Sequence, residues 1–427
     1  MKLGRRSFLA VSGALVAGAA GCVTGNHDDG DTDSGDDGST DGGPVGDDSS
    51  GGDSDENPNG NANDADDDQN QEGVRTPDPE WRYGTGGSIA AVSNGVLYGR
   101  EGFANGSGGV VALDAATGER LWGYGETSGY STYTPPVIGE YIYVGYGDDA
   151  IGSGSGHLTA IAPDGTERWR AEIGSVYEPP SLDGDRLYVG SDDGAVYCFD
   201  AGTGEAIWQH DFESRPEGPS NPSVAAVADG LVYVSLHDGL LAIDANDGTE
   251  RWIAWPGGGR IRSVHVGERV YAATRSLVAA FEDGELQWTS DRTGGSILVV
   301  RDGAVYVSDG FQFAVLDAAT GQERWGLGTD DRHAIGVGDA GPYVGLREVQ
   351  ALDSAGETRW QRSLDGSPIE CLTPADDGVY AGTDGGVYRL DGNGGVIAES
   401  PVGSLRDLLV ADRVYAATDE QLLALDL

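Results

Sequence analysis

The sequence predicts an all-β fold, a closed β-propeller of four-stranded blades, on three observations. Gly makes up 71 of 427 residues, which indicates many turns, and no segment shows the repeating apolar stripe of a long helix. A short apolar strand with a tyrosine near its middle recurs along the chain. Tryptophans recur at intervals of 35 to 47 residues, and a spacing near 40 is typical of a propeller blade. The tryptophans are Trp81, Trp122, Trp169, Trp208, Trp252, Trp288, Trp325 and Trp360. The strands are expected at residues 96–99, 141–145, 187–190, 231–234, 270–273, 304–307, 342–345, 378–382 and 414–417.

The two ends of the repeat region predict how the ring closes. The region begins with a lone tryptophan strand, residues 79–83, and ends with a strand pair, residues 413–418 and 421–427, that no tryptophan strand follows. Pairing the first strand with the last two completes a blade and covers edges that would otherwise aggregate. We count nine units in the 347 residues from 81 to 427, about 39 each, against about 43 for eight. The count favours nine, and eight stays open because one degenerate unit can lie outside the ring.

Residues 1–21 have the parts of an export signal. A basic start with Arg5 and Arg6 precedes a mainly apolar run, residues 8–20, that is too short to span a bilayer. The segment around the two arginines resembles the twin-arginine export signal, and residues 19–22 resemble a lipobox. This resemblance implies that Cys22 becomes the lipidated first residue of the mature protein; the alternative is a chance cysteine near an ordinary cleavage site. We therefore expect an exported protein, anchored to the outer face of the cell membrane through a lipid at Cys22.

Residues 22–75 are predicted to be a disordered acidic tether. Positions 26–75 hold 17 acidic residues, one arginine and almost no apolar side chain, so the segment cannot bury enough surface to become ordered. Asp64, Asp66 and Asp68 alternate as in a calcium-binding loop. The EF-hand pattern then needs Gly and Glu where Gln69 and Arg75 stand, and we expect no calcium site there. The propeller domain is expected to be residues 76–427.

The charge of the chain excludes one class of partner. Asp and Glu number 71 against 26 Lys and Arg, which gives a formal net charge of −45. Nucleic acids are bound mainly by basic side chains, so we expect no nucleic-acid partner. Every basic residue except Lys2 is an arginine, and the composition resembles that of salt-adapted haloarchaeal proteins. An ordinary acidic exported protein is the alternative.

One motif recurs at the end of the repeat unit and carries a family resemblance. Residues 112–122 read Ala-Leu-Asp-Ala-Ala-Thr-Gly-Glu-Arg-Leu-Trp, and Asp, Gly and Trp recur at similar offsets in other units. The motif resembles the tryptophan-docking motif of the pyrroloquinoline-quinone (PQQ) type propeller family, and the resemblance covers the whole expected domain. The unit ending at Trp169 has Ala162 in the Asp place, and the unit ending at Trp288 has Phe281. The aspartates of the motif are Asp114, Asp200, Asp244, Asp317 and Asp353.

Each residue type of the motif suits a structural role. Asp accepts hydrogen bonds from turn amides, Gly supplies a positive φ, and Trp lays a flat ring against the neighbouring blade. Burying one such ring stabilises a fold by about 2 to 3 kcal/mol. We therefore interpret the eight tryptophans and five aspartates as blade-docking residues. A ligand platform formed by the tryptophans is the alternative.

The resemblance also implies an enzyme alternative, a PQQ-dependent quinoprotein dehydrogenase. In such enzymes it implies two adjacent cysteines over the cofactor, a calcium ion held by Glu, Asn and Asp, and long insertions over the site. Here Cys198 and Cys371 are not adjacent, and we expect both to be buried thiols. The histidines occur at no metal-ligand or catalytic spacing. We predict no catalytic residue, no metal site and no cofactor, with PQQ and calcium only under the enzyme alternative; cofactor-binding residues stay unknown.

Three inserts break the period and mark candidate binding loops. Two are rich in Gly and Ser, residues 102–109 and 147–156, and Asn105 in the first is a candidate glycosylation site. The third, residues 213–221, is stiffened by prolines. Propellers bind ligands through loops on one face, so we expect this third insert to present a partner surface.

Together these observations favour a non-catalytic binding or assembly scaffold at the cell surface, with another cell-envelope protein as its partner. The non-enzymatic branch of the resembled family includes the bacterial outer-membrane-assembly lipoprotein, which implies a role of this kind. The alternatives are the quinoprotein dehydrogenase and an extracellular ligand-binding or sensor module. The fold alone does not decide among them.

Overall fold

The structure, a computed structural model, describes most of the chain from residue 74 onward. The described residues are 20–23, 74–84, 86–102, 108–125, 130–132, 134–148, 155–212, 222–237, 239–257, 259–291, 295, 297–329 and 331–427. They form 38 strands and no helix, which confirms the all-β prediction. In these ranges the chain therefore has no helix of the length and hydropathy needed to span a membrane. Arg5, Arg6, Asn105, most of the expected tether and the insert at 213–221 lie outside the described residues.

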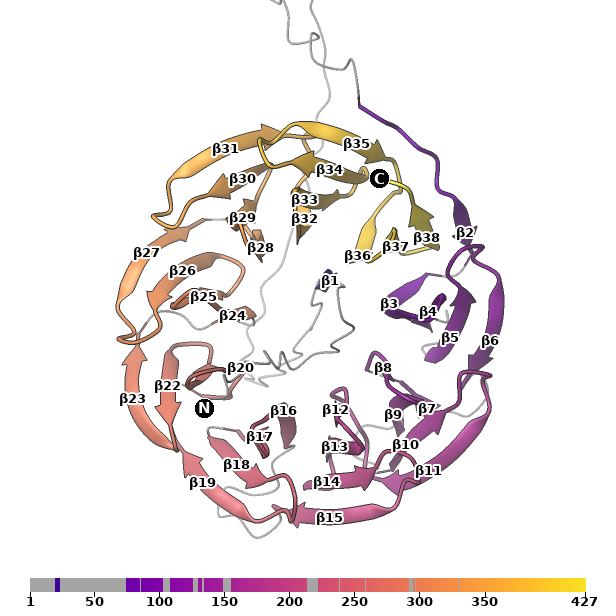
Figure 1. The fold of residues 1–427 in the computed structure, drawn as a ribbon, viewed down its shortest axis with the longest axis vertical. Helices are drawn as coiled ribbons and strands as arrows, with labels where there is room; N and C mark the ends of the chain where they lie inside the picture. Colours follow the sequence, from indigo (N-terminus) through magenta and orange to yellow (C-terminus); the bar gives the residue numbers. More distant parts are fainter. Residues whose placement is uncertain are drawn as a thin grey trace, which may run out of the picture. The chain divides into compact units, whose positions relative to one another are not determined.

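Nine antiparallel sheets follow one another around a ring (Figure 1). Consecutive strands pair within each sheet, and the first strand lies nearest the centre of the ring (Figure 1). We call the sheets blades 1 to 9 in chain order, so the described part of the chain decides the count in favour of nine. In blade 2 the innermost strand is divided into two pieces, β7 and β8, that both pair with β9.

Blades 1 to 3 consist of β3 (Gly87–Ser93), β4 (Val96–Gly102), β5 (Gly108–Asp114) and β6 (Arg120–Tyr124); β7 (Tyr130–Ser131), β8 (Val137–Ile138), β9 (Ile142–Asp148), β10 (Gly156–Ile161) and β11 (Glu167–Ile173); and β12 (Ser181–Asp183), β13 (Arg186–Ser191), β14 (Ala195–Asp200) and β15 (Ala206–Asp211). Blades 4 to 6 consist of β16 (Ser223–Ala228), β17 (Leu231–Ser235), β18 (Leu240–Asp244) and β19 (Glu250–Ala254); β20 (Ser263–Val266), β21 (Val270–Ala273), β22 (Val278–Glu282) and β23 (Glu285–Ser290); and β24 (Ile297–Arg301), β25 (Ala304–Ser308), β26 (Gln312–Asp317) and β27 (Glu323–Gly328). Blades 7 to 9 consist of β28 (Ala334–Gly338), β29 (Gly341–Gly345), β30 (Glu348–Leu352) and β31 (Thr358–Ser363); β32 (Ile369–Ala375), β33 (Gly378–Thr383), β34 (Val387–Asp391) and β35 (Val396–Ser400); and β36 (Leu405–Val410), β37 (Val414–Thr418), β38 (Leu422–Leu425) and β2 (Trp81–Tyr83).

The ring closes through the N-terminal strand, as predicted. β2 pairs antiparallel with β38 and supplies the outermost strand of blade 9, with Trp81 opposite Ala424. β1 (Ala20–Val23), which contains Cys22, pairs with β36 and adds a fifth strand to that sheet. A side chain also joins the first and last blades, because the carboxylate of Asp407 in β36 accepts a hydrogen bond from the backbone N–H of Ile89 in β3 at 3.1 Å.

The junction between blades 8 and 9 has no tryptophan, since Ala398 in β35 occupies its place. The backbone of Arg75 binds the outer edge of β35 there. Its N–H donates to the carbonyl of Ile397 at 3.2 Å, and its carbonyl accepts from the N–H of Glu399 at 2.8 Å. Leu427 is buried in the same cluster as Ala398. The segment that precedes β2 therefore covers the one junction where an indole is missing from the expected column.

The apolar core lies largely between neighbouring blades. In blade 3, for example, β13 and β14 are almost fully buried, while the outermost strand β15 is mostly exposed. One cluster joins Tyr188, Cys198 and Trp208 of blade 3 to Val232 of blade 4. Cys198 and Cys371 are both buried, as predicted. Because each blade buries its side chains against the next, the blades stabilise one another as stacked repeats do.

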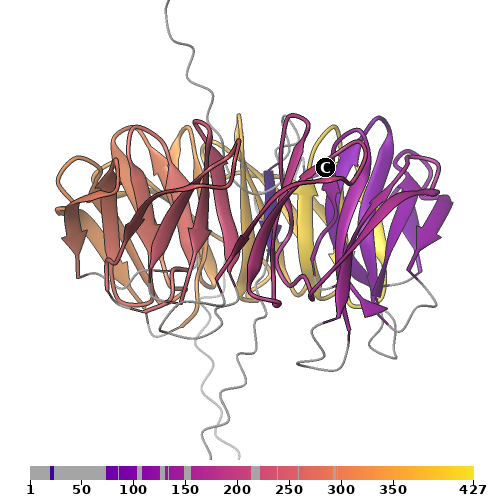
Figure 2. The same cartoon turned by 90° about the horizontal axis from the view of Figure 1, so that it is seen from below.

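The strands of the ring run between two faces (Figure 2). Turns that join the first strand of a blade to the second, and the third to the fourth, lie on one face, which we call the turn face. Hairpins that join the second strand to the third, and connections between blades, lie on the other, which we call the loop face. The predicted inserts at 102–109 and 147–156 belong to hairpins of the loop face, and the insert at 213–221 falls between β15 and β16, whose adjoining ends lie there.

Gly204 provides a test of the contact between blades. Its φ is +74°, and a β-carbon at this position would lie 2.5 Å from the ring of Trp169 in the preceding blade. Gly230 has nearly the same backbone, with a φ of +76°, but nothing lies within 4 Å of its β-carbon position. We expect Gly230→Ala to lower the free energy of unfolding by about 1 kcal/mol through backbone strain. Gly204→Ala should lower it by roughly 3 kcal/mol, because the indole must also move. Equal losses for the two variants in denaturant unfolding would contradict the role given to Trp169.

Candidate functional site

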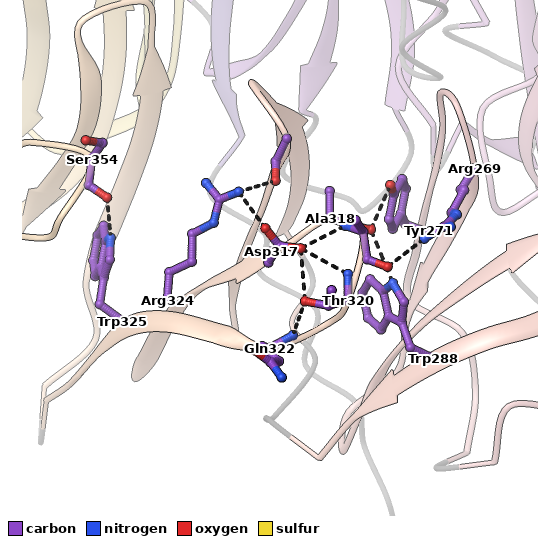
Figure 3. A network of polar contacts seen from close by, with 12 residues as sticks. Arg269, Tyr271, Trp288, Asp317, Ala318, Thr320, Gln322, Arg324, Trp325 and Ser354 are labelled. Carbon is purple, nitrogen blue, oxygen red and sulfur yellow. Dashed lines mark hydrogen bonds and ion pairs between the residues drawn. The ribbon is translucent and has the colours of Figure 1, made fainter.

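The turn between the third and fourth strands of a blade is built around one aspartate. In blade 6, Oδ1 of Asp317 accepts hydrogen bonds from the backbone N–H of Thr320 at 3.0 Å and from its hydroxyl at 2.9 Å. Nη2 of Arg324 donates to Oδ2 of Asp317 at 2.9 Å (Figure 3). These bonds, the one from Arg324 first, lower the pKa of Asp317. The carboxylate therefore stays ionised and fixes the backbone of the turn.

The tryptophan of the preceding blade packs on this turn and donates a hydrogen bond to it. Trp288 in β23 donates its indole N–H to the carbonyl of Ala318 at 3.2 Å, and Trp325 in β27 donates to that of Ser354 at 3.0 Å (Figure 3). Gly321, with a φ of +71°, lies under the ring of Trp288 and leaves room for it. In the described part of the chain, the predicted tryptophans that donate to a carbonyl of the next blade's turn, at 2.9–3.2 Å, are Trp81, Trp122, Trp169, Trp208, Trp288, Trp325 and Trp360.

The other aspartates of the motif bind their turns in the same way. Each accepts a hydrogen bond from at least one backbone N–H that lies two to four positions after it. Hydrogen bonds from Thr117 lower the pKa of Asp114. These aspartates are Asp114, Asp200, Asp244 and Asp353. The carboxylates and indoles that the sequence singles out thus lie at the blade junctions of the turn face.

Two units that depart from the motif form their turns differently. After Ala162, the carboxylate of Asp164 accepts both the backbone N–H and the hydroxyl of Thr166. After Phe281 the strands are joined by a shorter turn, Asp283 and Gly284, both with positive φ, and Trp252 covers this glycine. Sequence reasoning missed these solutions, because a motif at fixed offsets does not show a displaced aspartate or a shortened turn.

A cavity of about 390 Å³ lies between blades 5 and 6 on the turn face. Its lining includes Arg269, Tyr271 and the turn of Asp317. Nη1 of Arg269 donates to the carbonyl of Ala319 at 2.8 Å, and the hydroxyl of Tyr271 donates to that of Ala318 at 3.2 Å (Figure 3). These polar groups are already bonded across the blade junction, so we assign the cavity to the docking contact.

The residues present do not match the set that the enzyme alternative implies. Cys198 lies in β14 of blade 3 and Cys371 in β32 of blade 8, each buried in a different apolar cluster. Among the residues that the structure describes, no group of three or more His, Cys, Asp or Glu side chains is placed to hold a metal ion. The adjacent cysteines of a quinoprotein enzyme therefore have no counterpart in this part of the chain, and we derive no reaction step through PQQ.

A polar cluster with a buried histidine joins blades 1 and 2. The ring of His157 in β10 is 2% exposed and stacks on Tyr146 in β9, with ring centroids 4.7 Å apart. The hydroxyl of Tyr124 in β6 donates to Glu167 in β11, and Nη2 of Arg170 donates to Tyr124 at 3.0 Å and to Glu167 at 2.9 Å. Burial, together with the positive charge of Arg170, lowers the pKa of His157 to about 4.

Two more buried titratable groups contact neighbouring strands. Burial raises the pKa of Asp407 to about 7, although the backbone N–H groups of Ile89 and Leu408 donate to its carboxylate. Nε2 of His333 lies 3.2 Å from Oγ of Ser308, and burial lowers the pKa of His333. These partners are backbone and hydroxyl groups of adjacent elements, which fits a structural use of both side chains.

The loop face carries exposed aromatic residues that the sequence analysis did not single out. Trp255, the ninth tryptophan, follows β19 and is 49% exposed, and Phe311 in the hairpin between β25 and β26 is 47% exposed. Trp255 follows Trp252 by only three positions, whereas the blade-docking tryptophans are 35 to 47 residues apart. This irregular spacing could have identified Trp255 as a residue with another role. The expected partner surface at 213–221 lies outside the described residues.

His157 gives the fold a predictable response to acid. Its pKa is near 4 in the folded state and about 6.5 when unfolded, so the unfolded chain takes up the proton first as the pH falls. The stability that the neutral ring contributes is present above pH 6.5 and is lost as the pH falls toward 4. We expect the free energy of unfolding of the wild type to fall by about 1 to 2 kcal/mol more than that of His157→Phe when the pH is lowered from 7.5 to 5. Denaturant unfolding at constant salt measures both values. A difference that does not change with pH would contradict the burial of this group.

Comparison with known proteins places the chain among propellers. It matches the sequence profile of a family described as outer membrane protein assembly factor BamB over residues 106–255 and 237–345. BamB of Burkholderia pseudomallei (strain K96243) is 27% identical over an alignment of 334 positions that covers 72% of this chain and 78% of that protein. The crystal structure of BamB from Moraxella catarrhalis has a TM-score of 0.51 at 20% identity, over 72% of this chain and 91% of that chain. Quinohemoprotein alcohol dehydrogenase ADHIIG from Pseudomonas putida HK5 has a TM-score of 0.52 at 13% identity, over 84% of this chain and 77% of that chain.

The two structural likenesses have low sequence identity and show the fold alone. The profile match is of a different kind, since it spans residues 106–345 and so more than half of the sequence. It includes the turns of Asp114, Asp200, Asp244 and Asp317, and it confirms the PQQ-type propeller resemblance drawn from them. The chain belongs to the propeller family described as outer membrane protein assembly factor BamB.

Proposed function

We propose that this protein is a non-catalytic binding or assembly scaffold, anchored at the cell surface, whose partner is another cell-envelope protein. The observation that carries the proposal is the family match over residues 106–345, together with a curated BamB relative that aligns with most of both chains. That relative is named as an outer membrane protein assembly factor, and assembly requires a surface that binds another protein. From that relative we carry over to this chain the binding of an envelope protein, and we do not carry over a location at an outer membrane.

The arrangement of side chains on the turn face supports this reading. The tryptophans and aspartates of the motif bind the turns of neighbouring blades, and the two guanidiniums lining the cavity between blades 5 and 6 bind backbone carbonyls. These groups keep the ring rigid. A rigid ring holds the loops of the opposite face at fixed positions, which is the usual place for ligand binding on such a scaffold.

The anchor and the location belong to the same proposal. Arg5 and Arg6 would direct export by the twin-arginine route. Cleavage after residue 21 would remove half of β1, so that Cys22 would leave β36 and carry the lipid, and residues 22–75 would separate the propeller from the membrane. The signal would comprise residues 1–21 and the folded domain residues 76–427. An acidic spacer repels itself and stays extended, so the loop face can reach a partner held in the same envelope.

We include no cofactor in this proposal. The likeness to a quinohemoprotein alcohol dehydrogenase is a likeness of fold at 13% identity, and fold alone does not carry an activity. The resemblance implies two adjacent cysteines over PQQ, whereas Cys198 and Cys371 lie in different blades. A sensor or ligand-binding module stays as the further alternative, without a specific observation in its favour.

Site-specific photocrosslinking in the producing cells tests the scaffold role. A photoreactive phenylalanine analogue would replace Phe311 or Tyr177, which are 47% and 37% exposed on the loop face. The control would place the same analogue at Asn94, an exposed turn-face position between β3 and β4. We expect a discrete crosslink to one envelope protein from the loop-face positions and none from position 94. Equal labelling from both faces, or no crosslink from either loop-face position, would contradict the scaffold role.

A further inference from the structure

Arginines on the two faces of the ring differ in their partners. On the turn face, six arginines form ion pairs with carboxylates of the same blade or of its neighbour. These pairs are Arg251 with Asp244, Arg269 with Glu282, Arg301 with Asp339, Arg324 with Asp317, Arg389 with Asp377 and Arg413 with Glu80. The abundance of acid in the chain makes such pairing easy.

Four exposed arginines of the loop face form no ion pair with any residue that the structure describes. They are Arg260, Arg275, Arg332 and Arg347. Arg260 lies in the connection from β19 to β20, Arg275 in the hairpin between β21 and β22, Arg332 in the connection from β27 to β28, and Arg347 in the hairpin between β29 and β30. They therefore follow one another along the arc from blade 5 to blade 7. Arg406, farther around the same face, is paired with Asp419.

Carboxylates on this arc are partly engaged elsewhere. Oδ1 of Asp309 accepts the backbone N–H groups of Phe311 and Gln312, at 2.8 and 2.7 Å, and so caps its own hairpin. Oε1 of Glu348 accepts the hydroxyl of Ser363 at 2.9 Å. These acids stabilise the loops, and the four guanidiniums keep their donor groups available to a ligand.

Exposed aromatic rings lie on the same arc. Trp255 is in the connection that also holds Arg260, and Phe311 follows Gly310, whose β-carbon position would lie 3.3 Å from Nε of Arg332. The hairpin of Phe311 is held in place, because the N–H groups of His333 and Thr329 donate to the carbonyls of Gly310 and Phe311 at 2.8 and 2.9 Å. Aromatic and arginine side chains on a fixed backbone are the typical composition of a protein-binding surface.

We propose that the loop face of blades 5 to 7 binds an acidic, apolar-containing polypeptide segment through Arg260, Arg275, Arg332 and Arg347 and the rings of Trp255 and Phe311. We call these six residues the arginine-aromatic surface. The inference rests on the proposed scaffold function and names the chemistry of its partner. Guanidiniums bind carboxylates through paired hydrogen bonds, and apolar side chains of the segment pack on the two rings.

A polypeptide fits this surface better than a polyanion or a membrane. The whole chain has a net charge of −45 and repels a nucleic acid or an anionic bilayer over distances longer than one loop. A short polypeptide segment contacts only the loops of blades 5 to 7 and stays away from most of the acidic surface. Salt at about 1 M shortens the range of charge interactions to about 3 Å, so that direct guanidinium contacts and apolar packing still act.

Binding of a defined peptide to the full-length chain tests the proposal. The probe is a fluorescein-labelled twelve-residue peptide of alternating Asp and Leu, and its control carries Asn in place of Asp. Fluorescence anisotropy would compare the wild type with the triple variant Arg275→Gln, Arg332→Gln and Arg347→Gln. A second triple variant, Arg82→Gln, Arg168→Gln and Arg359→Gln, removes the same charge from exposed outer strands. We expect the first triple variant to weaken binding at least about tenfold, and the second to change it less than about twofold.

The remaining outcomes each decide against the proposal or separate it from the scaffold role. Failure of the wild type to bind the Asp peptide, equal binding of the Asn peptide, or equal loss in both triple variants would overturn it. Binding of phosphatidylglycerol vesicles through the same three arginines, without peptide binding, would assign the surface to a membrane instead. Cellular crosslinks from Tyr177 without peptide binding would overturn this surface and leave the scaffold role. Peptide binding without any cellular crosslink would leave this surface and contradict the scaffold role.

Discussion

The ring depends on an indole that lies on the turn of the next blade. A tryptophan reaches the carbonyl of that turn because a glycine with positive φ leaves space beneath the ring, and an aspartate fixes the turn by accepting its backbone N–H groups. The contact repeats around the ring, and the apolar clusters also lie between blades, so each junction stabilises two blades at once. Where the indole is missing, at Ala398, the backbone of Arg75 covers the junction instead.

This construction divides the chemistry of the molecule between its two faces. On the turn face, carboxylates are bound to turn amides or to arginines, as Asp317 is to Arg324. The hairpins and blade connections of the loop face also carry exposed side chains outside these contacts, among them Trp255 and Arg332. A protein with a net charge of −45 thus presents guanidiniums and aromatic rings on one arc, and a partner surface there agrees with the assembly role named for its relatives.

The fold could be predicted from the sequence because most units place their tryptophan, tyrosine and aspartate at the same positions of a blade. The closure with β38 could be predicted because the repeat region begins with a lone tryptophan strand at Trp81 and ends without one. The short turn at Asp283 and the buried pair of His157 and Tyr146 could not be predicted, since they depend on turn length and on contacts between strands. The amino-acid composition could not show which arginines lack an ion pair, because ion pairs depend on distances between side chains in the folded chain.

Titration of PQQ with calcium into the purified full-length chain tests the scaffold account most directly. The experiment would follow cofactor absorbance and dye reduction with short alcohols and sugars, in molar salt, after circular dichroism has shown that the sample is folded. The account predicts neither saturable binding of PQQ nor turnover. Saturable binding with turnover would contradict it, and would make the protein a quinoprotein enzyme whose catalytic residues lie outside the contacts described for the turn face.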